Sequence, residues 1–524
     1  MDNYDLIDVR PNTSFITSAS EYRKKDVEGL KMSKHRDSYL QIMKATSLIG
    51  GVQVFNILIT IIRSKIVAVL LGPAGMGIIG LLTSTTGVIS NLTNFGLGIS
   101  SVKDIAKANE TGDKKRISTV STAFHQIVWI TGLLGLITTV FLAPWLSQIT
   151  FGNRNYTVAF IWLSLTLLFN QLSSGQLVLL QGMRRLNYLA KANIYGSAIS
   201  LFVTLPLYYL WGIDGIVPGI IGTATVSLVV SWYFAAKIKI QKIVLTRSQT
   251  IQEGKNMLKM GFIISLSGLI SVGASYILRI FIGRTGGIEQ VGLYNAGFAI
   301  INTYVGVVLN AMATDYYPRL SEVANDNKEC KQTINQQAEI ALLILAPILI
   351  IFLVFINFVV ILLYSKQFIA VTDMIYWAAL GMFFKAASWS ITFLFLAKGT
   401  SKLYFWNEFI SNMLIFSLNL IGYHFWGLTG LGISFALAYL IYLVQVYIIS
   451  RARFEFNFEH YFIKIFEIQF SLAIAGFLVT KFLNKPFNYI FGIILVALSL
   501  WYSFNKLNKR LGLVSIIKNF HNKL

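Results

Sequence analysis

Long apolar segments dominate this chain and restrict what it can fold into. From residue 45 almost to the C-terminus, apolar stretches of about 20 residues follow one another with short polar loops between them. An α-helix of that length crosses the hydrocarbon core of a bilayer. Only 13% of the residues are charged, against about 25% in a soluble domain. The sequence therefore predicts an all-α polytopic membrane protein.

The spacing of the apolar segments predicts about fourteen transmembrane helices. The last two are separated by only three residues, Asn484 to Pro486. We expect the fourteen at residues 45–71, 77–102, 118–144, 156–181, 189–211, 214–236, 258–283, 291–316, 336–364, 372–397, 404–424, 427–450, 463–483 and 486–504.

Basic residues fall on alternate loops. The loops on one side of the membrane hold clusters of Lys and Arg, such as those in 103–116 and 237–259. The loops on the opposite side hold only Arg154, Arg284, Lys366, Lys481 and Lys485. Lys and Arg are retained on the cytoplasmic side of membrane proteins. This asymmetry predicts an even number of spans and places both termini in the cytoplasm. It also accounts for the net charge of +21 without a nucleic-acid partner.

The chain repeats itself. Trp211–Ile216 (WGIDGI) is echoed by Trp426–Leu431 (WGLTGL), and Gly182–Tyr188 by Gly399–Tyr404, at an offset of about 215 residues. This offset contains six spans, an even number, so the second copy begins on the same side of the membrane as the first and has the same orientation. We therefore expect two six-helix lobes related by a pseudo-two-fold axis along the membrane normal, with a cavity between them. The last two spans lie outside the repeat.

Four parts follow from this pattern. The polar residues before the first span form a tail without any span, and translation from Met32 or Met43 is an alternative start. The expected parts are a cytoplasmic N-terminal tail at 1–40, an N-lobe at 41–240, a C-lobe at 241–455, and an extra helix pair with a basic C-terminal tail at 456–524.

Four stretches resemble a known family. The block Lys65–Gly77 (KIVAVLLGPAGMG) resembles the end of the first span in Wzx-type translocases of O-antigen and other polysaccharide units. Tyr317–Ser321, Lys385 and Leu396–Gly399 agree with it in order and spacing, and the resemblance covers residues 41–450. It looks closest to members that carry lipid-linked enterobacterial common antigen units. The family belongs to the MOP exporter superfamily, with multidrug exporters and the lipid II flippase.

The resemblance implies a mechanism and a substrate. The expected protein is a flippase, not an enzyme, in the bacterial inner membrane. It would move an undecaprenyl-diphosphate-linked oligosaccharide from the cytoplasmic to the periplasmic leaflet by alternating access. It implies no cofactor, and its partners would be that glycan, membrane lipids and other polysaccharide assembly proteins. The long polar N-terminus and the extra C-terminal helix pair depart from the family pattern.

Four basic residues lie well inside the expected spans: Arg63, Lys65, Arg279 and Lys385. A cation near the bilayer centre is costly, so such residues usually face the bundle interior or water. We expect them to bind the diphosphate headgroup, with Lys65 and Arg279 paired across the cleft from matching positions in the two repeats. The alternative for Arg63, Lys65 and Arg279 is snorkelling to the interface. Arg63 and Lys65 point about 200° apart on a helix, so only one can face the cavity.

Acidic residues are rare inside the spans. Asp315 is a candidate for ion coupling or gating, and pairing with Arg319 is the structural alternative. Glu339 and Glu408 lie near helix ends, where solvation explains them. The single cysteine and the five histidines show no metal-site spacing, so we expect no metal site.

Two other functions share parts of this pattern. A cation-coupled multidrug exporter of the same fold would favour carboxylates over buried cations in its cavity. A membrane glycan polymerase would need a large soluble loop or an acidic catalytic pair on the outer face. The outer loops are short, and their only aspartates, Asp214 and Asp373, lie in separate loops. The buried charges here are mainly positive, which favours the flippase. Neither the particular glycan, the coupling ion nor the oligomeric state follows from the sequence.

Overall fold

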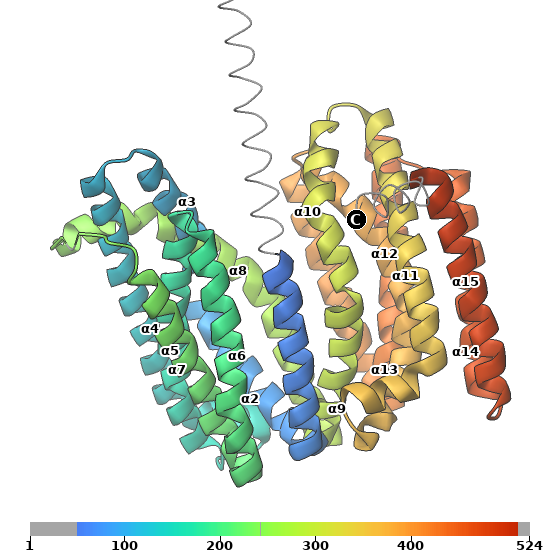
Figure 1. Ribbon diagram of the computed structural model, residues 1–524, viewed down its shortest axis with the longest axis horizontal. Coiled ribbons are helices and arrows are strands. Elements are labelled where there is room, and N and C mark those ends of the chain that lie inside the picture. Colours follow the sequence, from blue (N-terminus) through green and yellow to red (C-terminus); the bar gives the residue numbers. More distant parts are fainter. Residues whose placement is uncertain (1–49, 242, 512–524) are drawn as a thin grey trace, which may run out of the picture.

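All regular structure in the described part of the chain is helical. The computed structural model describes residues 50–241 and 243–511 (Figure 1). The predicted tail at 1–40 and its alternative starts lie outside these residues. Within them, twelve helical segments are long and apolar enough to cross a membrane. The chain is therefore a multi-pass membrane protein.

The first half of the chain supplies seven of the α-helices. They are the helix whose described part is Gly50–Leu70, α2 (Gly72–Thr93), α3 (Leu97–Glu110), α4 (Lys114–Phe151), α5 (Thr157–Gly182), α6 (Leu186–Trp211) and α7 (Ile216–Ala235), with the short η1 (Gly212–Gly215) between the last two.

The second half supplies the remaining helices. They are α8 (Arg247–Gly286), α9 (Ile288–Phe298), the π-helix η2 (Ala299–Val305), α10 (Val307–Glu322), α11 (Asn327–Leu363), η3 (Lys366–Val371), α12 (Thr372–Ala397), α13 (Ser401–Phe454), α14 (His460–Phe482) and α15 (Phe487–Leu511).

Two of the twelve segments are too long to cross a bilayer only once. Leu186–Ala235 has 50 residues and Ser401–Phe454 has 54. At about 1.5 Å per residue, each would be more than twice the thickness of a core of about 30 Å. Each instead turns back at a glycine with positive φ, Gly212 at 54° and Gly427 at 55°. Within the described residues, twelve segments, two of which cross twice, give fourteen crossings, in agreement with the predicted number.

The internal repeat is visible in the backbone itself. Three pairs of residues with positive φ are each separated by 215 positions. They are Gly72 (64°) with Gly287 (89°), Arg184 (55°) with Gly399 (67°), and Gly212 (54°) with Gly427 (55°). The two copies thus turn at equivalent places, and the predicted fold class of two similar halves plus a C-terminal helix pair is confirmed.

Helices of the two halves form two bundles. In Figure 1, α3–α7 lie on one side and α10–α15 on the other, with α2, α8 and α9 between them. The bundles diverge toward the end that carries the basic loops 103–116 and 319–331, the upper end of the view. We call this the basic end. The helix α8 contacts both bundles: its Glu253 forms an ion pair with Arg116 of α4, and its Phe281 ring lies 6.0 Å from the Tyr423 ring of α13. The domain limits at residues 240 and 455 stay predictions.

The two halves meet tightly at the end opposite the basic loops. A Cβ on Gly292 of α9 would overlap the Pro73 carbonyl oxygen and lie 2.9 Å from the backbone nitrogen of Gly77 in α2. Arg284, near the end of α8, donates to the carbonyl oxygen of Ile149 in α4 at 2.6 Å. These contacts close the structure at this end, which we call the closed end.

Two expected spans are interrupted. The segment predicted at 77–102 is two helices, because α2 ends at Thr93 and α3 starts at Leu97. Phe95 and Gly96 have positive φ there, and Gly261 of α8 packs against the Phe95 carbonyl with no room for a side chain. The segment predicted at 291–316 contains the π-helix Ala299–Val305, a form that occurs frequently at functional sites.

The C-terminal helix pair is bonded to α11 through its last helix, α15. Arg510 of α15 makes two hydrogen bonds to Glu339 of α11, Nε to Oε1 and Nη2 to Oε2, both at 3.2 Å. The Glu339 side chain is only 7% exposed. The interpretation of Glu339 as a solvated helix end was therefore wrong: the sequence does not show that α15 folds back over α11.

Candidate substrate-binding cavity

A polar cavity lies between the two halves of the protein. Its volume is about 660 Å³, and α2, α8, α9 and η2 form its walls. Hydroxyl and amide groups make up much of its lining. The polar residues are Thr83, Ser84, Ser271, Ser275, Arg279, Tyr294, Asn295, Asn302 and Thr303. Arg279 is the only charged residue in this lining.

Arg279 is held in place by its neighbours. Its Nε donates to Asn295 Oδ1 at 2.9 Å, and its Nη1 donates to the Ser275 carbonyl oxygen at 3.1 Å. The guanidinium lies 5.6 Å from the centre of the Tyr294 ring. Its Nη2 has no hydrogen-bond partner among the described residues. The side chain therefore keeps a donor for a ligand in the cavity.

Lys385 reaches the same wall from α12. Its Nζ donates to Asn302 Oδ1 at 2.9 Å and lies 5.1 Å from the centre of the Tyr439 ring. Asn295 and Asn302 belong to one continuous helical segment, α9 and η2, and both line the cavity. The structure thus links two of the predicted basic residues to one wall, each through an asparagine.

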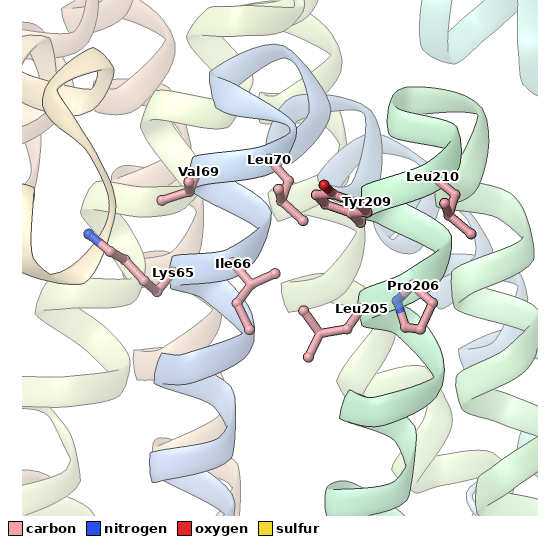
Figure 2. Close-up of a pocket in the computed structure, with 8 residues that line it drawn as sticks. All are labelled: Lys65, Ile66, Val69, Leu70, Leu205, Pro206, Tyr209 and Leu210. Carbon is pink, nitrogen blue, oxygen red and sulfur yellow. The ribbon is translucent and has the colours of Figure 1, made fainter.

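Lys65 lies elsewhere. Figure 2 shows its ammonium group directed away from α6, whereas Ile66 and Leu70 face α6 across an apolar groove. Its Nζ donates to the carbonyl oxygens of Ile361 at 2.8 Å and Tyr364 at 2.6 Å, at the end of α11. Lys65 therefore joins the two halves at the closed end. From their matching positions in the two repeats we expected Lys65 and Arg279 to lie together across the cleft. The structure instead places them at different sites.

Arg63 and Asp315 stand apart from the cavity. Arg63 is half-buried, and its Nε is buried without a hydrogen-bond partner. Asp315 is exposed on α10 and makes no ion pair among the described residues. Arg319, its expected structural partner, instead donates to Gln337 Oε1 at 2.8 Å. The coupling role of Asp315 stays a prediction.

A second, smaller pocket adjoins Lys385 inside the C-terminal half. It has a volume of about 240 Å³ and lies between α12 and the two arms of α13. Glu408 lines it and accepts a hydrogen bond from the Tyr442 hydroxyl. The interpretation of Glu408 as a solvated end was wrong, because the fold-back of α13 at Gly427 places Tyr442 against it.

The asparagines were missed from the sequence. Asn295 and Asn302 are seven residues apart in the eighth expected span. Two amides spaced two turns apart in an apolar span are a signal for one polar face. No sequence signal identifies their partners, because Arg279 and Lys385 come from other helices.

The fold and this cavity define a polytopic membrane transporter with two similar halves around a central site. A family model described as "Polysaccharide biosynthesis protein" matches residues 66–373, more than half of the chain. The chain belongs to this family.

Individual relatives agree with the family. The lipid III flippase of Escherichia coli K12 is 22% identical over 385 residues, which cover 72% of this chain and 90% of that protein. A putative O-antigen transporter of Shigella flexneri is 24% identical over 292 residues, covering 54% and 68%. Among solved structures, the lipid II flippase MurJ in an inward closed conformation matches with a TM-score of 0.69 at 14% identity, covering 90% and 99%. These relatives are named as flippases or transporters rather than as enzymes.

Proposed function

We propose that this protein is a flippase for a lipid-linked oligosaccharide of surface polysaccharide synthesis. It moves an undecaprenyl-diphosphate-linked glycan from the cytoplasmic to the periplasmic leaflet of the inner membrane by alternating access. The family and the names of the relatives support this class of substrate. The observation that carries the proposal is that Arg279 lines the cavity between the two halves and that Lys385, from the adjoining pocket, donates to Asn302 in the wall of the same cavity.

The charges of the cavity suit a diphosphate. A cation inside a membrane protein is costly unless it faces water or an anion. Among the described residues, the hydrogen-bond partners of Arg279 (Asn295 and Ser275) and of Lys385 (Asn302) are all neutral, so no carboxylate there neutralises either charge at hydrogen-bond distance. A diphosphate would supply that compensation through charge-assisted hydrogen bonds. The hydroxyl groups of α2 and α8 offer partners for the sugars.

The structure fits one step of the transport cycle. The basic end faces the cytoplasm according to the positive-inside rule, which also places both termini there. The tight contacts at Gly77 and Gly292 then lie on the periplasmic side, so this state receives substrate from the cytoplasm. Release into the outer leaflet requires the contacts of Gly292, Lys65 and Arg284 to break.

Complementation of a flippase-null strain tests the function. The parent chain should restore surface glycan, and Arg279→Ala and Lys385→Ala should each reduce the glycan formed per unit of membrane protein. Lys509→Ala is the matched control, because Lys509 is exposed on α15. Full complementation by both cavity variants would contradict the proposal. Export of a cationic dye with no effect on glycan would favour the multidrug exporter instead.

A further inference from the structure

The pocket next to Lys385 holds a carboxylate that the proposed transport step does not use. Glu408 lies about one-third of the way along the first arm of α13 and is half-buried. The Tyr442 hydroxyl donates to its Oε1, and Asn407 Nδ2 donates to the same hydroxyl at 3.3 Å. The Thr392 hydroxyl lies 3.0 Å from the Tyr442 hydroxyl. Asn407 and Thr392 thus hold the Tyr442 hydroxyl, which in turn holds the Glu408 carboxylate in the pocket.

Glu408 and Lys385 both line this one pocket. Lys385, Ser388 and Thr392 follow α12 toward the basic end, where Tyr404 and Leu396 complete the lining near Glu408. The volume of about 240 Å³ has room for several waters. The titratable groups that face Glu408 are Lys385 from α12 and Tyr404, Tyr439 and Tyr442 from α13. Lys385 is the only cation among them.

Lys385 therefore belongs to two sites. Its ammonium group donates to Asn302 on the wall of the central cavity, and its side chain also lines the pocket of Glu408. An anion bound at the cavity side places negative charge beside Lys385. Like charges in one site favour the neutral form of a carboxyl group. Occupancy of the cavity must then change the proton occupancy of Glu408, and the effect is reciprocal.

We propose that Glu408 is a proton-exchange site coupled through Lys385 to the headgroup in the central cavity. This inference rests on the proposed function and adds to it a carboxyl group whose proton occupancy follows the binding of the headgroup. When the diphosphate engages Lys385, Glu408 takes up a proton from the side of the basic loops. When the headgroup leaves, Glu408 releases the proton. A metal cation such as Na⁺ fits this pocket poorly, because the Lys385 ammonium group shares it.

The sign of the coupling follows directly. The cavity binds the anionic headgroup more tightly when Glu408 is protonated. The affinity of the protein for the headgroup therefore falls as pH rises. A single linked proton changes the dissociation constant by at most about tenfold per pH unit. Glu408→Gln keeps an oxygen that can accept the Tyr442 hydrogen bond, but it cannot exchange a proton. The affinity of the Glu408→Gln variant for the diphosphate headgroup should therefore be the same at every pH.

Calorimetric binding of undecaprenyl-diphosphate-linked N-acetylglucosamine to the purified full chain tests this, because both phosphates of this probe are esterified and keep a constant charge over the pH range used. Titrations at pH 5.5–8.5 in two buffers with different heats of ionisation give both the dissociation constant and the protons taken up. The parent should take up a fraction of a proton and lose about tenfold or more in affinity across this range. Glu408→Gln should take up none and show a flat profile, and Lys385→Arg should keep the pH dependence.

The possible failures are distinguishable. No binding by the parent at any pH would overturn the proposed function and the coupling with it. Binding with the same pH dependence in the parent and in Glu408→Gln would overturn the coupling alone. Replacing NaCl by choline chloride at fixed pH should leave the affinity unchanged, and a requirement for Na⁺ would overturn the assignment of a proton.

Discussion

Gly77 and Gly292 lie back to back at the closed end, although 215 positions separate them in the chain. A Cβ on Gly292 would lie 2.9 Å from the Gly77 backbone nitrogen, and one on Gly77 would be 2.9 Å from the Ile288 Cγ2 atom. The two glycines occupy equivalent places in the repeats. Contact between equivalent residues is expected close to a two-fold axis. The helices α2 and α9 thus close the protein near the axis that relates its two halves.

Substitution of Gly292 should open the closed end. Gly292→Val has no room for its side chain against Pro73 and Gly77, so α2 and α9 must separate. A cysteine at Thr83, which is exposed in the central cavity, reports this through its reaction with a membrane-impermeant maleimide added from the periplasm. Gly292→Val should raise the labelling rate. Gly273→Ala is the control, because a Cβ there meets nothing within 4 Å.

Removal of the Lys65 ammonium group should weaken the same closure. Lys65 donates to two carbonyl oxygens at the end of α11, where a cation is favoured by the helix dipole. Each charge-assisted hydrogen bond contributes about 1.5–3 kcal/mol, less for a half-buried group. Lys65→Met should therefore increase maleimide labelling of the Thr83 cysteine. Lys366→Ala, an exposed neighbour of the same charge, should not. Equal labelling in both variants would mean that Lys65 does not hold the halves together.

The Glu339–Arg510 pair should stabilise the C-terminal helix pair. Arg510→Ala leaves a buried carboxylate without its partner, which we expect to cost about 1–2 kcal/mol, because Arg510 itself is half-exposed. The melting temperature of the purified protein should fall, and α15 should become more sensitive to trypsin. Lys509→Ala, one residue away and exposed, serves as the control. An unchanged melting temperature for Arg510→Ala would show that the pair contributes no net stability.

Much of the fold follows from local patterns in the sequence. Apolar length located the spans, and the echo of Trp211–Ile216 by Trp426–Leu431 located two equivalent turns, at Gly212 and Gly427. Both patterns act within short stretches of chain. The break between α2 and α3 was missed because it depends on Gly261, a residue of a distant helix.

The candidate site was less predictable than the fold. Because buried charge is costly, the sequence identified Arg279 and Lys385 as candidate binding residues. Their hydrogen-bond partners Asn295 and Asn302 come from another helical segment and could not be identified in the same way. Lys65 was expected beside Arg279, whereas its partners are backbone carbonyl groups, which have no sequence signature. The role of Glu408 depends on Tyr442, which only the fold-back of α13 brings close.

Flipping by the purified protein in liposomes tests the central claim most directly. The measurement is the rate at which a fluorescent undecaprenyl-diphosphate-linked oligosaccharide becomes accessible on the opposite leaflet. We expect the parent to move it, and Lys385→Ala and Arg279→Ala to slow this by roughly ten- to a hundredfold, because each loses about 1.5–3 kcal/mol of charge-assisted contact with the headgroup. Lys509→Ala should match the parent. Absence of flipping by the parent, or parental rates in both cavity variants, would contradict the account.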